Sequence, residues 1–160
     1  MARSSLPPLA AATTSAVLQA FAPYELRLTS NRRALLAVLE AAERPLTADE
    51  IVERSGVALS TVYRNLGEMV DVGVVARVAM DGGGDRYELA EQLSLHHHHH
   101  LVCTECGIVT DFSPSADLER RIADEVVHLL DHEGFEVTSH VFDVRGRCRR
   151  CRAHGDRRSV

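Results

Sequence analysis

The chain has 160 residues, of which 45% are hydrophobic and only 4% aromatic, with no Trp. This length suits one mid-sized domain or two small ones, and the shortage of large aromatic side chains favours two small units with aliphatic cores. The net charge of -5 excludes a uniformly basic nucleic-acid-binding protein, although a local basic surface can still contact DNA.

The first 24 residues are rich in Ala, Ser, Thr and Pro. Arg3 and the apolar stretch 9–17 loosely resemble a secretion signal, but prolines and the polar residues 13–15 break up the region. We therefore expect residues 1–24 to form a flexible or partly helical N-terminal arm. No apolar run reaches the roughly 18 residues of a membrane helix, which favours a cytoplasmic protein without a membrane partner.

A first helix is predicted from Asn31, where apolar residues recur every three or four positions from Ala34 to Ala42. Thr29 or Ser30 can cap it. All 18 basic residues of the chain are Arg, and three of them lie in the acid-free stretch before and at this helix: Arg27, Arg32 and Arg33. They fit a solvated helix start and a clamp for DNA phosphates about equally well.

A second, short helix begins with a capping box, in which Thr47 caps the amide of Glu50 and Glu50 reaches back. Gly56 marks its end. A third helix is expected over 61–72, with Ser60 as its cap. The second and third helices therefore meet across a tight turn, which is typical of a helix-turn-helix.

A hairpin follows the three helices. Strands are expected over 74–80 and 86–89, joined by a Gly-rich turn. Two helices across a tight turn, followed by a hairpin, is the order of a winged helix-turn-helix, a DNA-binding fold. The sequence therefore predicts this fold for the first half of the chain.

The third helix offers side chains that could contact DNA. With Val62 and Leu66 facing the core, Ser60, Tyr63 and Arg64 face outward at the end that meets base edges in the major groove. Arg64 can donate two hydrogen bonds to guanine, and Tyr63 can contact a thymine methyl group or a phosphate. The alternative is an ordinary surface Arg with a half-buried Tyr, and the predicted wing favours DNA contact over it.

The second half of the chain mixes strands and helix. After a linker over 91–95, we expect strands over 96–103 and 107–112, a long helix over 114–133 and a last strand over 135–144. The predicted fold class is therefore α/β of the α+β type, in which a small sheet and a long helix follow the winged helix.

The four cysteines form two C-x-x-C pairs, Cys103 with Cys106 and Cys148 with Cys151. In a reducing cytosol, two such pairs far apart in sequence favour zinc over disulfides. Each turn supplies two thiolates, and two turns complete a tetrahedral shell with no open position. The site would therefore be structural rather than catalytic, with a redox dithiol as the alternative.

Five consecutive histidines begin the strand that follows the linker. An engineered tag is one interpretation, but the run is internal and leads directly into the strand. Alternate strand residues share a face, so His97 and His99 face one way and His96, His98 and His100 the other. One run can therefore feed two metal sites, and imidazole suits zinc, iron, nickel or copper.

Three motifs occur in order: T-V-Y-R-N-L at 61–66, H-H-H-H-H-L-V-C-T-E-C-G at 96–107 and S-H-V-F-D-V-R-G-R-C at 139–148. With these motifs and Cys151, the chain resembles the ferric uptake regulator family of bacterial metal-dependent repressors over about residues 28–151. The histidine-rich run resembles the zinc uptake regulators. The resemblance implies a homodimer that binds a palindromic DNA operator when a sensing metal is bound.

The resemblance also implies roles for individual residues. The four cysteines match the family's structural zinc site, with one ion per chain. The regulatory site would hold Zn(II) or Fe(II), and its ligands would be His97, His99, Glu119 and His140, with Asp117 as the substitute for Glu119. A further site would use Glu88, His100 and Asp111, without the histidine that the family places before the second helix. The DNA contacts would come from Arg33, Ser60, Thr61, Tyr63 and Arg64.

These assignments divide the chain into an arm at 1–24, a DNA-binding domain at 25–90, a hinge at 91–95, a dimerisation and metal-binding domain at 96–152 and a disordered tail at 153–160. We expect a zinc-responsive repressor, because a shell of nitrogens with one carboxylate suits zinc. An iron-responsive repressor or a peroxide sensor of the same family is the alternative. A zinc hydrolase or a metal-storage protein is the alternative outside the family, but no H-E-x-x-H, phosphate loop or nucleophile elbow supports an enzyme.

Overall fold

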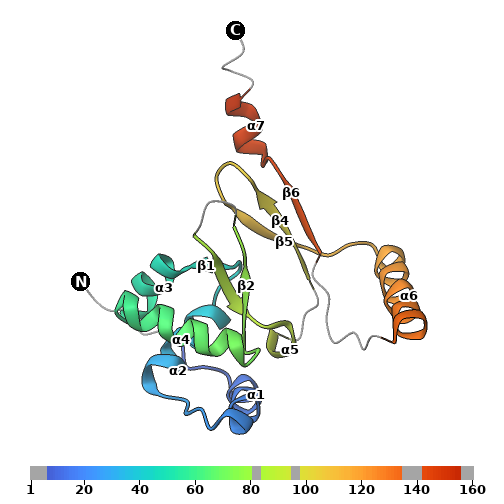
Figure 1. Cartoon of the computed structure of the whole chain (residues 1–160). Helices are drawn as coiled ribbons and strands as arrows, with labels where there is room; N and C mark the ends of the chain where they lie inside the picture. Colours follow the sequence, from blue (N-terminus) through green and yellow to red (C-terminus); the bar gives the residue numbers. More distant parts are fainter. Residues whose placement is uncertain (1–6, 81–83, 95–97, 135–141, 156–160) are drawn as a thin grey trace. The chain divides into compact units, whose positions relative to one another are not determined.

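The computed structural model describes residues 7–80, 84–94, 98–134 and 142–155. The chain divides into two compact units, Met1–His96 and His97–Val160 (Figure 1). Within the described residues, no helix is both long and apolar enough to span a membrane.

Helices dominate the first unit. In chain order they are α1 Ala11–Phe21, the 3-10 helix η1 Ala22–Tyr24, α2 Ser30–Glu40, α3 Ala48–Ser55, α4 Leu59–Asp71 and α5 Glu91–Ser94. The core that they enclose is mainly aliphatic, and its large, fully buried members include Leu35, Leu36, Leu46, Ile51, Leu66 and Met69. The three predicted helices therefore pack around one core, as the composition suggests.

Of the two expectations for the N-terminal arm, the partly helical one is confirmed and the flexible one is wrong, because Ala11–Phe21 fold as α1. A buried face repeats every four residues through Leu9, Thr13, Val17 and Phe21, which is the spacing of one side of a helix. The Thr13 hydroxyl donates to Glu40 of α2, and the Ala10 amide donates to the same carboxylate at 2.9 Å. Pro7 and Pro8 lie before the first turn, so they do not interrupt the helix.

Several predicted helix ends are confirmed. Thr29 Oγ1 accepts a hydrogen bond from an amide of the first turn of α2, at 3.4 Å. Thr47 and Glu50 form the predicted capping box of α3. Gly56 ends α3 in a left-handed conformation with a φ of 70°, which glycine adopts without steric cost.

The predicted cap of the third predicted helix is wrong. The helix α4 begins at Leu59, one residue before Ser60, because Ala58 is the residue that takes the extended conformation before the first turn. The Ala58 carbonyl accepts the first helical hydrogen bond, from Val62 at 2.9 Å, and no side chain caps the helix. Ser60 therefore lies in the first turn with its side chain exposed.

A small antiparallel sheet in the order β1-β3-β2 completes the first unit. Its strands are β1 Leu46–Thr47, β2 Val75–Val78 and β3 Arg86–Leu89. The hairpin of β2 and β3 pairs Val75 with Leu89, and the middle of its turn, 81–83, lies outside the described residues. The predicted winged helix-turn-helix is confirmed. The sequence did not predict β1, and the strand predicted over 74–80 is longer than β2.

The second unit is a three-stranded sheet with two helices: β4 His99–Cys103, β5 Val109–Phe112, α6 Ala116–Glu133, β6 Asp143–Gly146 and α7 Arg149–Gly155. The strand order is β5-β4-β6, with β4 antiparallel to β5 and parallel to β6. This sheet and the long helix confirm the predicted α+β class.

Two expectations for this unit need correction. The predicted strand over 135–144 coincides with β6 only at its end, and residues 135–141 lie outside the described residues. The expected disordered tail is wrong for residues 153–155, which complete α7. A helical segment of seven residues that begins inside the second C-x-x-C motif gave too short a periodic pattern to be recognised.

Candidate metal centres and nucleic-acid interface

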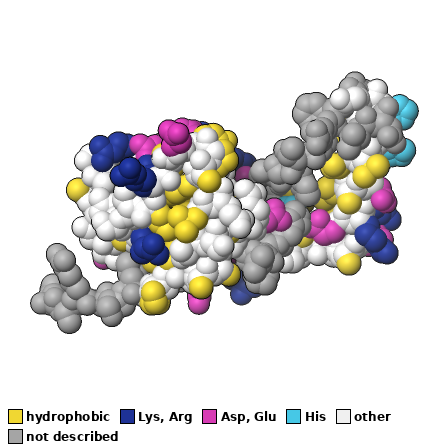
Figure 2. All heavy atoms as spheres, turned by 90° about the horizontal axis from the view of Figure 1, so that it is seen from below, with side chains coloured by type: hydrophobic (Ala, Val, Ile, Leu, Met, Phe, Trp, Pro, Cys, Tyr) yellow, Lys and Arg dark blue, Asp and Glu magenta, His cyan; other side chains and the backbone are white. Residues whose placement is uncertain are grey.

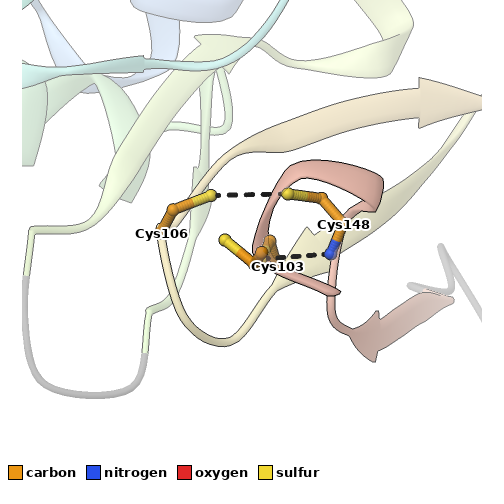
Figure 3. Close-up of side chains that lie close together, drawn as sticks. Cys103, Cys106 and Cys148 are labelled. Carbon is orange, nitrogen blue, oxygen red and sulfur yellow. Dashed lines mark hydrogen bonds between the residues drawn. The ribbon is translucent and has the colours of Figure 1, made fainter. Parts of the chain in front are cut away.

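The four cysteines meet at one end of the second sheet. Parallel pairing of β4 with β6 puts Cys103 opposite Gly146, two residues before Cys148. The four sulfur atoms all lie within 4.8 Å of one another, and none of the four cysteines is in a disulfide. Cys106 Sγ and Cys148 Sγ are 3.8 Å apart (Figure 3). Four thiolates about 2.3 Å from a tetrahedral zinc ion are also roughly 3.8 Å apart, so the donor set fits zinc.

Hydrogen bonds shift the pKa values of Cys103 and Cys151 in opposite directions. The Cys148 amide donates to Cys103 Sγ at 3.3 Å, and this bond, followed by one from the Cys106 amide, lowers the pKa of Cys103 to about 6. The hydrogen bond with Cys106 raises the pKa of Cys151 to about 12. Without a cation the cluster therefore keeps protons, whereas a divalent ion favours thiolates at all four positions.

The histidine run divides between two faces of β4, as the alternation predicts. His98 and His100 lie on one side, where their rings contact edge to face with centroids 5.3 Å apart. A ligand atom of each lies within 4.8 Å of a carboxylate oxygen of Asp111, which is the partner of His100 in β5. His100 Nδ1 also lies 3.2 Å from Asp143 Oδ1, and such a carboxylate can fix the tautomer of a metal-bound imidazole.

Sequence reasoning missed His98 and Asp143 as members of this cluster. The two-residue alternation of the run already put His98 on the face of His100. Nothing in the sequence pointed to Asp143, because its place beside His100 comes from the parallel pairing of β4 with β6. The predicted third member, Glu88, lies half-buried on β3 of the first unit.

His99 points to the other face and lies beside α6. Its Nε2 is 2.8 Å from Glu119 Oε1, and its side chain is only 2% exposed. The rings of Phe112 and Phe142 flank it, with centroids 5.8 and 5.4 Å away. This brings together two of the predicted regulatory ligands. The other two, His97 and His140, lie outside the described residues.

Asp117, the substitute for Glu119, has different partners. Its carboxylate pairs with Arg120 at 3.2 Å and with Arg121 at 3.1 Å on the exposed side of α6. Glu119 is two residues further along the helix, so its side chain leaves the helix in a different direction. Of these two carboxylates, the structure brings Glu119 to His99.

The outer face of α4 carries the predicted DNA-contacting side chains. Ser60, Tyr63 and Arg64 are exposed, with Tyr63 at 52%, while Thr61 is half-buried. Val62 and Leu66 on the opposite face are fully buried in the core. The residues that fix the helix and the residues free to meet DNA are therefore separated, as in a recognition helix.

The two arginines in the first turn of α2 do not act alike. Arg33 is exposed, whereas Arg32 is buried, so a phosphate clamp of three arginines is wrong for Arg32. On the face drawn in Figure 2, the Arg side chains, in dark blue, form separate patches.

Arg32 instead connects three helices. Its guanidinium donates to Asn65 Oδ1 of α4 at 3.2 Å and to the Arg27 carbonyl at 2.6 Å, and pairs with Glu68. It also lies 5.6 Å from the ring centroid of Phe21 in α1. A buried guanidinium is stable only when its donors are satisfied, and these contacts supply the partners.

The model of the ferric uptake regulator family matches residues 24–145, which is more than half of the chain. The chain belongs to the ferric uptake regulator family. The match stops before Cys148 and Cys151, so their place in the cysteine cluster rests on the geometry described above.

Relatives with known roles agree with this family. The peroxide-responsive repressor PerR of Staphylococcus saprophyticus is 31% identical over 131 residues, which are 78% of this chain and 82% of PerR. The structure of the ferric uptake regulator of Pseudomonas aeruginosa with manganese is 30% identical, with a TM-score of 0.66 over 86% of this chain and 98% of that one. The Vibrio cholerae regulator is also 30% identical, with a TM-score of 0.60 over 81% and 98%.

Members of the ferric uptake regulator family are transcriptional regulators that bind DNA and metal and act as dimers. The chain is therefore a metal-responsive regulator rather than an enzyme. Its cysteine cluster and its cluster of His98, His100 and Asp111 supply ligand sets suited to metal ions.

Proposed function

We propose that this chain is a zinc-responsive repressor of the cytoplasm that binds palindromic operators as a homodimer when its regulatory metal is bound. The observation that carries the proposal is the contact between the buried His99 and the half-buried Glu119, with a ring nitrogen 2.8 Å from a carboxylate oxygen. A shell of imidazole nitrogens with one carboxylate suits zinc. The histidine run at the start of the second unit provides such nitrogens in excess.

The proposal assigns three metal sites. The four cysteines hold a structural zinc ion in a closed shell. The regulatory ion is held by His97, His99, Glu119 and His140. A further ion is held by His100 and Asp111, joined by His98 from the same face of β4, and Glu88 is included on the family resemblance alone.

The proposed mechanism follows from where the regulatory ligands lie in the chain. The division between the units falls between His96 and His97, so His97 is the first residue of the second unit. A metal ion bound by His97 and His99 fixes the start of this unit against Glu119 of α6. Fixing the segment that leads to the DNA-binding unit restricts the angles available to it. The ion acts by favouring the arrangement that matches DNA, with a coupling free energy of about 1–3 kcal/mol.

DNA recognition is assigned to the exposed end of α4. Arg64 reads guanine and Tyr63 contacts a thymine methyl group or a phosphate, with Ser60 and Thr61 beside them and Arg33 at the phosphate backbone. Two copies of the helix would read the two halves of a palindrome.

The second unit carries surface that suits dimerisation. Apolar side chains are exposed on its sheet and on α6: Leu101, Ile108, Leu118, Val127, Leu129 and Val144. Contiguous exposed apolar surface commonly marks an interface, and a second copy of the chain is the partner that the family implies.

Peroxide sensing through bound iron is the second candidate. The observation that favours it is the relationship to peroxide-responsive repressors, of which the Staphylococcus saprophyticus protein is 31% identical. A simple iron-responsive repressor would use the same architecture. The three candidates differ in the metal that licenses DNA binding and in the response to peroxide.

Fluorescence anisotropy with palindromic operator DNA separates these candidates. The full chain, with one zinc bound per chain, is titrated in buffered free Zn(II), in anaerobic Fe(II), and with a chelator. Binding in Zn(II) alone that is insensitive to hydrogen peroxide is the expected result. Binding in Fe(II) that is lost after peroxide treatment would instead identify a peroxide sensor. If no metal promotes binding to any operator, the proposal of a metal-dependent repressor is wrong.

A further inference from the structure

The long helix of the second unit carries two histidines that belong to none of the three metal sites. His128 and His132 lie four residues apart on α6, and both side chains are exposed. Their ring centroids are 5.9 Å apart and their planes are tilted by 39°. Residues four apart are neighbours on one face of a helix. In Figure 2, histidine atoms, in cyan, reach the surface of this part of the molecule.

The charge around the pair favours a cation. Asp124 precedes His128 by four residues and Glu125 precedes it by three, and both side chains are exposed. The nearest arginines of the helix, Arg120 and Arg121, already pair with a carboxylate one turn earlier. The two acids therefore contribute negative potential next to the histidines with little opposition from the arginines.

We propose that His128 and His132 chelate one divalent late transition-metal ion, with water completing its shell. Imidazole nitrogens bind such ions at about 2.0–2.1 Å, which brings two ring centroids to roughly 5 Å. The pair must therefore close by about 1 Å, and rotation of two exposed side chains achieves this without moving the backbone. Affinities rise towards copper along the divalent series, so nickel, copper and zinc are the ions of choice.

Nickel is a suitable probe, because its paramagnetism broadens the NMR signals of nearby amides. The full chain, loaded with one zinc per chain, is dialysed against low-micromolar Ni(II). Bound nickel is counted by atomic emission, and the amide signals of α6 are recorded. The variants are His128→Gln, His132→Gln and the double substitution. Gln is a good helix former, and circular dichroism checks that helix content is unchanged.

The result expected of a chelate is that each single substitution lowers bound nickel by one equivalent per chain and removes the broadening at the C-terminal end of α6, around His128 and His132 and away from Glu119. The double substitution also loses one equivalent and no more. The single variants have already lost the whole ion, because the one ring that remains in them cannot hold it. His98→Gln is the matched control, since it alters the other histidine cluster and leaves the broadening in α6 unchanged.

Two results would overturn the proposal. One is a wild-type protein in which nickel does not broaden the amide signals around His128 and His132. The other is a loss of only half of this bound nickel in each single variant, because it would mean that the two histidines bind nickel independently. Neither result depends on whether the chain senses zinc or binds an operator. The test of this site is therefore independent of the proposed function.

Discussion

Arg32 Nε of α2 donates a hydrogen bond to Asn65 Oδ1 of α4 at 3.2 Å, inside the first unit. The side chain of Asn65 makes a second hydrogen bond, in which its Nδ2 donates to the Thr61 carbonyl at 2.7 Å. The amide of one side chain therefore joins a buried cation to the first turns of the proposed recognition helix. We expect these hydrogen bonds to help fix the part of α4 that carries Tyr63 and Arg64.

Replacing Arg32 with Ala is expected to lower the free energy of unfolding by about 2 kcal/mol, because Asn65 and Glu68 lose a buried charged partner. The estimate is at the low end for such pairs, since Glu68 is partly exposed. Urea unfolding followed by circular dichroism measures the change. Arg33→Ala is the matched control and should change stability by less than about 0.5 kcal/mol. Equal losses in the two variants would contradict the structural role of Arg32.

Arg64→Ala should leave stability unchanged and reduce discrimination between operator sequences. A bidentate contact to guanine is worth about 1–3 kcal/mol against the wrong base. Anisotropy titrations with an operator and with single-base variants measure the difference. Arg33→Ala should instead weaken binding to all sequences alike and make the salt dependence shallower by about one unit. A uniform loss for Arg64→Ala would place that residue on a phosphate.

Glu119→Gln should raise the concentration of free metal needed for DNA binding by at least tenfold, since it removes the carboxylate next to His99. Asp117→Asn is the control in the same helix, because its carboxylate pairs with two exposed arginines instead. The measurement is DNA binding across buffered Zn(II) concentrations. If Asp117→Asn shifted the curve and Glu119→Gln did not, the carboxylate would be assigned wrongly.

Removing the structural metal should unfold much of the second unit. Zinc binding to a four-cysteine site contributes about 10–16 kcal/mol at neutral pH, and the metal-free cluster retains protons because the pKa of Cys151 is raised to about 12. Treatment with a strong chelator should release one zinc per chain and dissociate the dimer, as measured by size-exclusion chromatography with light scattering. Cys148→Ser should behave like the chelated protein. A dimer that survives with no zinc would refute the structural role.

Glu50 should make the first unit sensitive to acid. The hydrogen bond with Arg44 lowers the pKa of this carboxyl to about 2, from an ordinary value of 4.5. A depressed pKa in the folded state stabilises the protein above pH 4.5, and the contribution is lost as the pH falls towards 2. Glu50→Gln should therefore lose about 1–2 kcal/mol at neutral pH and flatten the acid limb of the stability profile. Asp49→Asn, in the same helical turn, should leave the acid limb as it is.

The prediction from sequence succeeded where the determining interactions are short-range. Thr47 and Glu50 are three residues apart, so their capping box follows from local geometry alone. The C-x-x-C spacing already fixes which two sulfurs meet in each turn. The alternation of side chains along a strand separated His99 from His100 before any sheet was known.

Tertiary structure decided which of several equivalent residues takes a role. Arg32 and Arg33 are adjacent and identical in type, and only the packing of α1 and α4 around α2 buries the first and exposes the second. Asp117 and Glu119 differ in the direction in which they leave α6, and Asp143 reaches His100 only through the pairing of β4 with β6. The sequence by itself therefore determined most of the elements, the pairing of sulfurs within each C-x-x-C motif and the family. The partners of each charged side chain depended on contacts between distant segments, because burial and ion pairing are properties of the assembled core and not of a local pattern.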